Sequence, residues 1–291
     1  MNSVENLLEI LQLKHLKDNQ FEGVSETVGS PNVFGGQVLA QALNAAYRTI
    51  TNGRVLHSLH SYFLEAGHLE YPINYDVSIM RDGGSFSVRR VTASQNDEVI
   101  FILSASFHKE EEGYSHQIEM KTDIKQPEEL MSWTDVLEEY GSMLPTKIKS
   151  FLEIPRPVEF KPTHIANPFD KVDLPPYIDI WFKLKGDNAD IADLNLAIRQ
   201  QILTYISDYN ILSVALQPHA SKAHWGNLLT ASLDHSMWFF REFDFSDWLL
   251  FSLETPSTGN ARGFARGNIF TRDGVLVASV AQEGLMRPIK K

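Results

Sequence analysis

The sequence predicts an α+β protein made of two related halves, and three observations support this fold class. The pattern of residues 81–107 returns 176 residues further on, in residues 257–283. Each of these segments shows two runs of alternating hydrophobicity separated by a polar turn, which is the pattern of an antiparallel hairpin. A long helical pattern precedes each hairpin, so a unit of one helix and one sheet is expected twice.

The two helical patterns begin the two units. The first covers residues 34–47 and starts with Gly35 and Gly36, where a close approach of another backbone is useful. The second covers residues 192–208 and places leucine, isoleucine and tyrosine on one face. Three or four antiparallel strands follow each helix. A sheet wrapped around one central helix is called a hotdog, so the sequence predicts a double hotdog.

The chain is expected to divide into three segments. Residues 1–115 form the N-terminal hotdog repeat, residues 116–150 a linker with short helices, and residues 151–291 the C-terminal repeat with the catalytic residues. The linker is predicted because charged and polar side chains dominate there. Alternation resumes at residues 156–160 and 178–182, which we expect to be strands that open the second repeat.

Composition excludes several classes of function. The chain has 291 residues, of which 43% are hydrophobic and 22% charged, with a net charge of −11 and no cysteine. Disulfides, cysteine-bound metals and a catalytic thiolate are therefore excluded. An acidic chain is also a poor partner for nucleic acid. No apolar run approaches the roughly 18 residues that a membrane span needs.

No targeting signal is expected, and several common catalytic motifs do not occur in the sequence. The opening segment contains Glu5 and Glu9 among its apolar residues, so an amphipathic helix is expected rather than a signal peptide. The last residues do not form a Ser-Lys-Leu signal, so a cytoplasmic location is expected. The chain has no G-x-S-x-G elbow, Walker loop or H-E-x-x-H motif, and its histidines are scattered. We therefore expect no cofactor and no metal.

Three polar residues of the second half interrupt apolar patterns. Asp208 lies at the end of the second helical pattern, and Gln282 at the end of a predicted strand. Ser232 lies within another predicted strand, with Asp234 two residues on and therefore on the same face. A carboxylate, a hydroxyl and an amide around one point can orient and deprotonate a water molecule. Spacing alone also fits a helix cap or ion pair for the aspartate and bonds to nearby backbone for the other two.

Several longer strings resemble the acyl-CoA thioesterase II family and follow the same order along nearly the whole chain. They are VFGGQVLAQAL from Val33, HSLHSYFL from His57, RDGGSFSVRRV from Arg81, VALQPH from Val214, LDHSMWFF from Leu233, ARGFARG from Ala261 and DGVLVASVAQEGLMR from Asp273. The resemblance implies a double hotdog that hydrolyses acyl-CoA thioesters without a covalent intermediate. It also implies that Asp208, Ser232 and Gln282 form the family's catalytic triad of Asp, Ser or Thr, and Gln.

An acyl-CoA substrate, medium- to long-chain on this interpretation, requires an apolar channel and cations for its phosphates. Channel candidates are Phe63, Trp238 and Phe239, with ordinary core packing as the alternative. Gly35 and Gly36 are candidates for binding a phosphate or a carbonyl, with tight helix–sheet packing as the alternative. The arginines of the repeated hairpins are candidates for the phosphates, with ordinary surface ion pairs as the alternative: Arg81, Arg89, Arg90, Arg262 and Arg266.

Two rival functions stay open at this point. A hydratase or dehydratase of the same fold would need an Asp–His pair and would leave Gln282 without a role. A non-catalytic acyl-CoA-binding protein would not need the three polar residues at all. The expected partners are an acyl-CoA substrate and further copies of the chain, because exposed sheet edges favour a dimer or tetramer.

Overall fold

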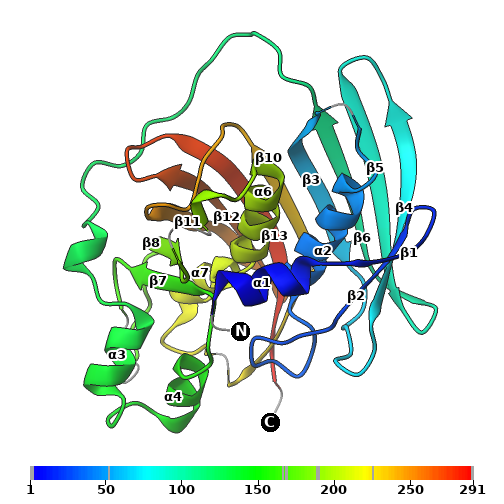
Figure 1. Cartoon of the computed structure of the whole chain (residues 1–291). Helices are drawn as coiled ribbons and strands as arrows, with labels where there is room; N and C mark the ends of the chain where they lie inside the picture. Colours follow the sequence, from blue (N-terminus) through cyan, green and yellow to red (C-terminus); the bar gives the residue numbers. More distant parts are fainter. Residues whose placement is uncertain are drawn as a thin grey trace.

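One continuous antiparallel sheet runs through both halves of the chain in this computed structural model, which describes residues 3–51, 53–165, 167, 170–187, 191–224 and 226–289 (Figure 1). Its strands are β1 (Lys14–Lys17), β2 (Gln20–Gly23), β3 (Val55–Phe63), β4 (Ile73–Asp82), β5 (Phe86–Gln95), β6 (Glu98–His108), β7 (Val158–Pro162), β8 (Tyr177–Leu184), β9 (Leu228–Ser232), β10 (Asp234–Phe239), β11 (Leu249–Gly259), β12 (Arg262–Thr271) and β13 (Leu276–Pro288).

The strand order shows the predicted repeat. Hydrogen-bonded neighbours follow the order β1-β2-β4-β5-β6-β3-β10-β13-β12-β11-β8-β7, and β9 pairs with β13. From the β3–β10 junction outward, the halves run β3-β6-β5-β4-β2 and β10-β13-β12-β11-β8. Each of these strands in one half therefore has an equivalent strand in the other half. The ten-residue strands β5 and β12 begin at Phe86 and Arg262, which keeps the spacing of 176 residues seen in the sequence.

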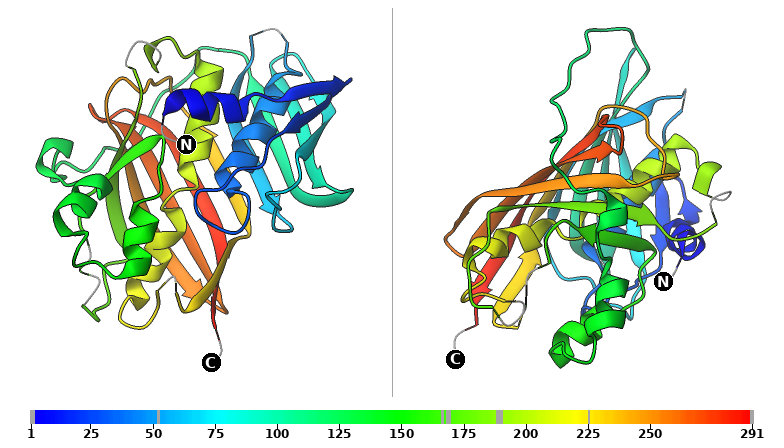
Figure 2. Two further views of the ribbon diagram at one scale, coloured as in Figure 1. Left: turned by 60° about the horizontal axis from the view of Figure 1, so that its bottom comes forward. Right: turned by 90° about the vertical axis from the view of Figure 1, so that its left-hand side faces the viewer.

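Two central helices lie side by side on one face of the sheet (Figures 1 and 2). They are α2 (Gly35–Tyr47) and α6 (Leu196–Ser207). α2 packs against β4, β5 and β6, whereas α6 packs against α2 and β3. The other helical segments are α1 (Val4–Leu11), η1 (Pro127–Glu129), α3 (Trp133–Tyr140), α4 (Thr146–Leu152), α7 (Ile211–Leu216) and η2 (Gln217–His219). None of these described helices is long and apolar enough to cross a membrane.

The second central helix is shorter than the prediction of residues 192–208. It begins at Leu196 because the side chain of Asn195 accepts a hydrogen bond of 3.0 Å from a backbone N–H of the first turn. The chain turns away beyond its end because Asn210 adopts the left-handed conformation, with φ of 65°. Asp208 therefore occupies the C-cap position, where α6 stops and the chain turns toward α7.

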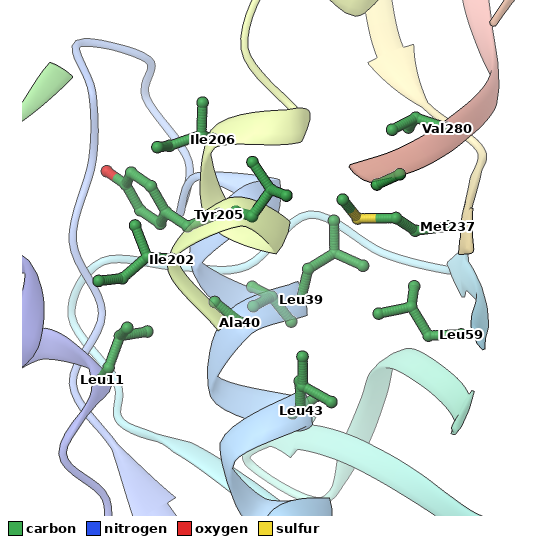
Figure 3. Close-up of a cluster of buried hydrophobic side chains, with 14 of the residues drawn as sticks. Leu11, Leu39, Ala40, Leu43, Leu59, Ile202, Tyr205, Ile206, Met237 and Val280 are labelled. Atoms are coloured by element: carbon green, nitrogen blue, oxygen red, sulfur yellow. The ribbon is translucent and has the colours of Figure 1, made fainter. Parts of the chain in front are cut away.

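The core lies where both central helices meet the strands beside the β3–β10 junction (Figure 3). Side chains from the two halves mix in it, and each buried side chain of leucine size contributes about 1.5–3 kcal/mol. Its members include Leu39, Ala40 and Leu43 from α2, Ile202, Tyr205 and Ile206 from α6, and Leu59, Met237 and Val280 from the strands. Each half therefore covers apolar surface of the other.

The segment between β6 and β7 contains α3 and α4 and packs against the second half. Its Met120 and Ile124 contact a small apolar cluster around Trp181 and Leu250. The indole N–H of Trp181 donates a hydrogen bond of 2.8 Å to the Lys125 carbonyl of the linker. In Figure 1 the linker runs from the end of β6 around the second half to α3 and α4.

Gly36 sets the distance between the central helices. A Cβ atom at this position would lie 2.4 Å from the Tyr205 carbonyl oxygen of α6, well inside van der Waals contact. We expect Gly36→Ala to force the helices apart and to lower the free energy of unfolding by about 1–3 kcal/mol, measured by urea denaturation. Gly113→Ala is the matched control, because no atom lies within 4 Å of its Cβ position. Equal stability of the two variants would contradict this account of the helix contact.

Candidate active site

Three polar side chains from separate elements meet beside the central helices. The Nε2 atom of Gln282 donates hydrogen bonds to Asp208 Oδ1 at 3.2 Å and to Ser232 Oγ at 2.9 Å. These residues come from the C-cap of α6, the last position of β9 and the interior of β13. The structure therefore brings together the three residues that the sequence singled out. Gln282 is not at a strand end as expected, because β13 continues to Pro288.

A β-bulge decides which side chains face this polar cluster. The strand predicted around Ser232 is interrupted at Leu233, and β9 and β10 pair with β13 in registers that differ by one residue. Leu233 and Asp234 both hydrogen-bond to Glu283, so two residues face one at this point. Such a bulge reverses the alternation of the side chains beyond it. The prediction that Ser232 and Asp234 share a face is therefore wrong. Instead, Ser232 and His235, three residues apart, both contact Gln282.

Asp208 lies between the ends of two helices. Its own helix α6 ends there, where the aligned carbonyl groups disfavour a negative charge. Helix α2 begins beside it, and the backbone N–H of Gly36 donates a hydrogen bond to the carboxylate. A Cβ atom on Gly35 would lie 2.8 Å from Asp208 Oδ2, so the close approach requires glycine. The positive end of a first-half helix therefore stabilises a carboxylate of the second half.

Burial has the largest influence on the Asp208 carboxyl group and raises its pKa above the ordinary value for aspartate. The imidazole of His235 and the hydrogen bonds from Gln282, Gly36 and Ser232 act in the opposite direction, but the net shift of the pKa is upward. Asp208 as a whole residue is half-buried. Its carboxyl group is therefore a stronger base than that of an aspartate in water.

A buried histidine that the sequence interpretation missed completes the cluster. The ring Nδ1 of His235 contacts Gln282 Oε1, and the ring Nε2 lies 3.0 Å from Ser207 Oγ. Burial lowers the pKa of His235 below its ordinary value. A signal was present in the sequence, because the alternation of His235 with Met237 and Phe239 places the histidine on the apolar face of β10.

Comparison with known proteins identifies the family. A family model described as acyl-CoA thioesterase matches residues 149–285, and one described as acyl-CoA thioesterase N-terminal domain matches residues 24–108. Acyl-CoA thioesterase 2 of Haemophilus influenzae is 38% identical over 98% of this chain and 98% of that protein. The chain belongs to the acyl-CoA thioesterase II family. Its enzyme class is that of the thioester hydrolases.

Solved structures confirm the double-hotdog fold of this thioesterase. The acyl-CoA thioesterase II TesB2 of Mycobacterium marinum is 32% identical, with a TM-score of 0.78 over 97% of this chain and 98% of that chain. A protein from Alicyclobacillus acidocaldarius with a hot dog fold is 16% identical, with a TM-score of 0.75 over 97% of this chain and 98% of that chain. The second likeness concerns the fold alone.

The aromatic candidates of the thioesterase separate into two groups. Phe63 lies next to the polar cluster, since its ring is 3.0 Å from the Cβ position of Gly35. Phe239 is buried on the inward face of β10. Trp238 lies on the opposite face of that strand, edge-on to the ring of His60 at 5.2 Å between centroids. Trp238 therefore points away from the polar cluster.

The hairpin arginines do not join the polar cluster, and three of them already have acidic partners. The pairs are Arg89–Asp82 at 2.9 Å, Arg262–Glu283 at 2.8 Å and Arg266–Glu254 at 2.6 Å. Arg89 is buried, so it is not part of a surface patch as expected. Arg81 and Arg90 are exposed. Within the described part of the chain, no three side chains of His, Asp or Glu gather in a group that could hold a metal ion.

In this thioesterase the pKa of the Asp208 carboxyl group is expected to exceed the ordinary value for aspartate, because burial outweighs the hydrogen bonds. Carboxyl ¹³C shifts followed through a pH titration measure it, with Asp208→Asn to assign the signal. Gln282→Ala removes a donor to the carboxylate and should raise the pKa further. An Asp208 pKa at or below the ordinary value would count against this view of the site.

Proposed function

We propose that this thioesterase hydrolyses acyl-CoA through a water molecule that Asp208, Ser232 and Gln282 hold and activate. One observation carries the proposal: a carboxylate with a raised pKa is joined to an amide, and the amide to a hydroxyl, by hydrogen bonds of 3.2 and 2.9 Å. A hydrolytic water needs one group that accepts its proton and others that fix its position. The cluster offers both kinds of group at one point.

The reaction needs no covalent enzyme intermediate. The water oxygen attacks the thioester carbonyl carbon while Asp208 accepts a proton from the water. The tetrahedral intermediate carries its negative charge on the former carbonyl oxygen. When it collapses, the C–S bond breaks and the fatty acid is released. The CoA thiolate then takes the proton from Asp208, which restores the carboxylate.

The beginning of α2 supports the proposal because it offers donors to the developing oxyanion. The first N–H groups of a helix have no partners within the helix. Gly36 already uses one of them for Asp208, and neither Gly35 nor Gly36 has a side chain that blocks the approach of substrate. The hydroxyl of Ser232 donates to Asp208 in this structure and is the second donor to the oxyanion when its proton turns to the substrate. Loss of one oxyanion donor typically lowers kcat by about 10²–10³.

The acyl chain on this proposal is that of a medium- to long-chain fatty acid. Apolar rings flank the polar cluster: Phe34 packs on Tyr205 and Tyr209, with centroid distances of 5.1 and 4.6 Å, and Phe63 lies beside Gly35. Each methylene group that leaves water for such surroundings contributes about 0.8 kcal/mol to binding. The CoA part extends toward solvent, where the exposed arginines Arg81 and Arg90 are candidates for its phosphates.

The rival functions fit the site less well. A hydratase needs a direct Asp–His pair, but the amide of Gln282 stands between Asp208 and His235 and bonds to both. That arrangement supports hydrolysis, in which the amide has a role. A non-catalytic binding protein would gain nothing from a buried carboxylate with a raised pKa, because burying that charge costs stability.

The proposal extends to the organisation of the enzyme. The catalytic side chains belong to a C-terminal unit of residues 151–291, which a linker of residues 116–150 joins to an N-terminal unit of residues 1–115. The strands β1 and β7 end the strand order of the sheet, and such edges support assembly into a homo-oligomer. A cytoplasmic location is part of the same proposal.

Asp208→Asn is expected to lower kcat for palmitoyl-CoA by about 10²–10⁴, because an amide cannot accept the water proton. Thiol release is measured with a chromogenic disulfide, in which the cysteine-free protein is itself silent. Asp76→Asn is the matched control, since this carboxylate of β4 is exposed and accepts a hydrogen bond from Gln20 at 2.7 Å. A wild-type rate in Asp208→Asn would overturn the mechanism, and hydration of an enoyl-CoA without thiol release would favour the hydratase.

Ser232→Thr and Ser232→Ala test whether the hydroxyl group of Ser232 is needed for activity. The threonine variant keeps the hydroxyl that accepts from Gln282, so it should retain most of the activity on palmitoyl-CoA. The alanine variant removes the hydroxyl and is expected to lose about tenfold or more in kcat, since one hydrogen bond to the reacting centre is lost. Equal rates for the two variants would show that the hydroxyl plays no part.

A further inference from the structure

His235 is a fully buried titratable side chain for which the proposed chemistry has no use. It is 0% exposed and lies on the inward face of β10, next to Gln282. Burying an imidazole costs free energy, because both ring nitrogens lose water and need hydrogen-bond partners within the protein. Both ring nitrogens do have partners, and these partners determine where its proton resides.

The amide of Gln282 fixes the role of the first ring nitrogen. Its Nε2 donates to Asp208 and to Ser232, so the opposite end, Oε1, faces Nδ1 of His235. An amide oxygen only accepts hydrogen bonds. Nδ1 must therefore carry a proton and donate it to Gln282. If the amide were rotated, its oxygen would face the Asp208 carboxylate, and the hydrogen bond to that carboxylate would be replaced by repulsion between two acceptors.

Ser207 satisfies the second ring nitrogen. Its Oγ lies 3.0 Å from Nε2 of His235 and 2.8 Å from the Thr204 carbonyl oxygen. Burial lowers the pKa of His235, so the ring holds a single proton at neutral pH, and Nδ1 already needs it. Nε2 is then an acceptor, and so is the Thr204 carbonyl oxygen, so the single proton of the Ser207 hydroxyl is shared between these two atoms.

We propose that His235 is a positioning residue that acts as the neutral Nδ1–H tautomer and locks the amide of Gln282 with its N–H groups toward Asp208 and Ser232. The order of donation is Ser207 to His235, His235 to Gln282, and Gln282 to the two groups that hold the water. His235 touches neither water nor substrate in this scheme. Its kinetic consequence rests on the proposed function of the three residues, whereas its tautomer does not.

Two substitutions of His235 by an amide side chain test its two ring nitrogens separately. In His235→Asn the side-chain amide reaches the position of Nδ1 and can still donate to Gln282. In His235→Gln the longer amide reaches the position of Nε2 and leaves Gln282 Oε1 without its donor. We expect kcat for palmitoyl-CoA within about threefold of wild type for His235→Asn, and about 10- to 100-fold lower for His235→Gln, with little change in KM for either.

Circular dichroism and thermal melting establish that both variants are folded. With both folded, equal losses of kcat in the two variants would overturn the proposal, because they would show that the Nδ1 donor is not what matters. A wild-type kcat in His235→Gln would overturn it as well. A larger fall in His235→Gln than in His235→Asn supports it.

The tautomer is measured directly in the wild-type protein by ¹⁵N NMR of its histidine rings at neutral pH. The signals of His235 are those that disappear in His235→Asn, or that shift in Ser207→Ala if the first variant does not fold. We expect a protonated Nδ1 and an unprotonated Nε2. The opposite tautomer or a doubly protonated ring would overturn the proposal. Because this readout needs no turnover, an enzyme without thiol release would refute the proposed function and leave the inference on His235 to be decided by the spectrum.

Discussion

The carboxylate of Asp208 lies where two helices meet, and burial removes water from it. The arrangement of the second half depends on supplying this carboxylate with hydrogen-bond donors. Its own helix disfavours the charge, so donors must come from elsewhere in the structure. Gly36 supplies a backbone N–H from the first half, and Gln282 supplies an amide N–H from β13. The Gly36 donor reaches the carboxylate because α2 packs against α6, whereas Gln282 and Asp208 both belong to the second half. One of the two donors therefore depends on the contact between the halves.

The β-bulge at Leu233 determines which side chains of the sheet lie beside Gln282, the partner of the Asp208 carboxylate. Without the extra residue, alternation would place Ser232 and Asp234 on one face and turn His235 away from Gln282. The bulge instead gives the amide of Gln282 a hydroxyl on its donor side and an imidazole on its acceptor side. An unbranched amide rotates easily, and two different partners at its two ends leave it one favourable orientation. One added residue in a strand therefore determines the direction of a hydrogen-bond chain.

Patterns of neighbouring residues in the sequence were sufficient to predict most of the fold. They predicted only part of the candidate site. Residues 34–47 were predicted as a helix, and α2 spans Gly35–Tyr47, because helical periodicity acts over a few residues. The bulge at Leu233 depends on the pairing of β9 and β10 with β13, and no local pattern encodes a partner so distant in the chain. The burial of Arg89 was missed for a related reason, since its partners include Asp82 on β4 and Thr49 beyond α2.

The two equivalent hotdog units each have a central helix, and the N-termini of these two helices are capped differently. At α6, the side chain of Asn195 accepts a hydrogen bond from the first turn, which occupies a donor of that turn within its own chain segment. At α2, the N-cap residue is Phe34, which has no polar side chain to do this. The unoccupied N–H groups of α2 are left for Asp208, which meets them at Gly36. The two helices differ at their other ends as well, because the C-cap is Arg48 in α2 and Asp208 in α6. In the proposed site the first half therefore contributes a helix end and the second half the side chains.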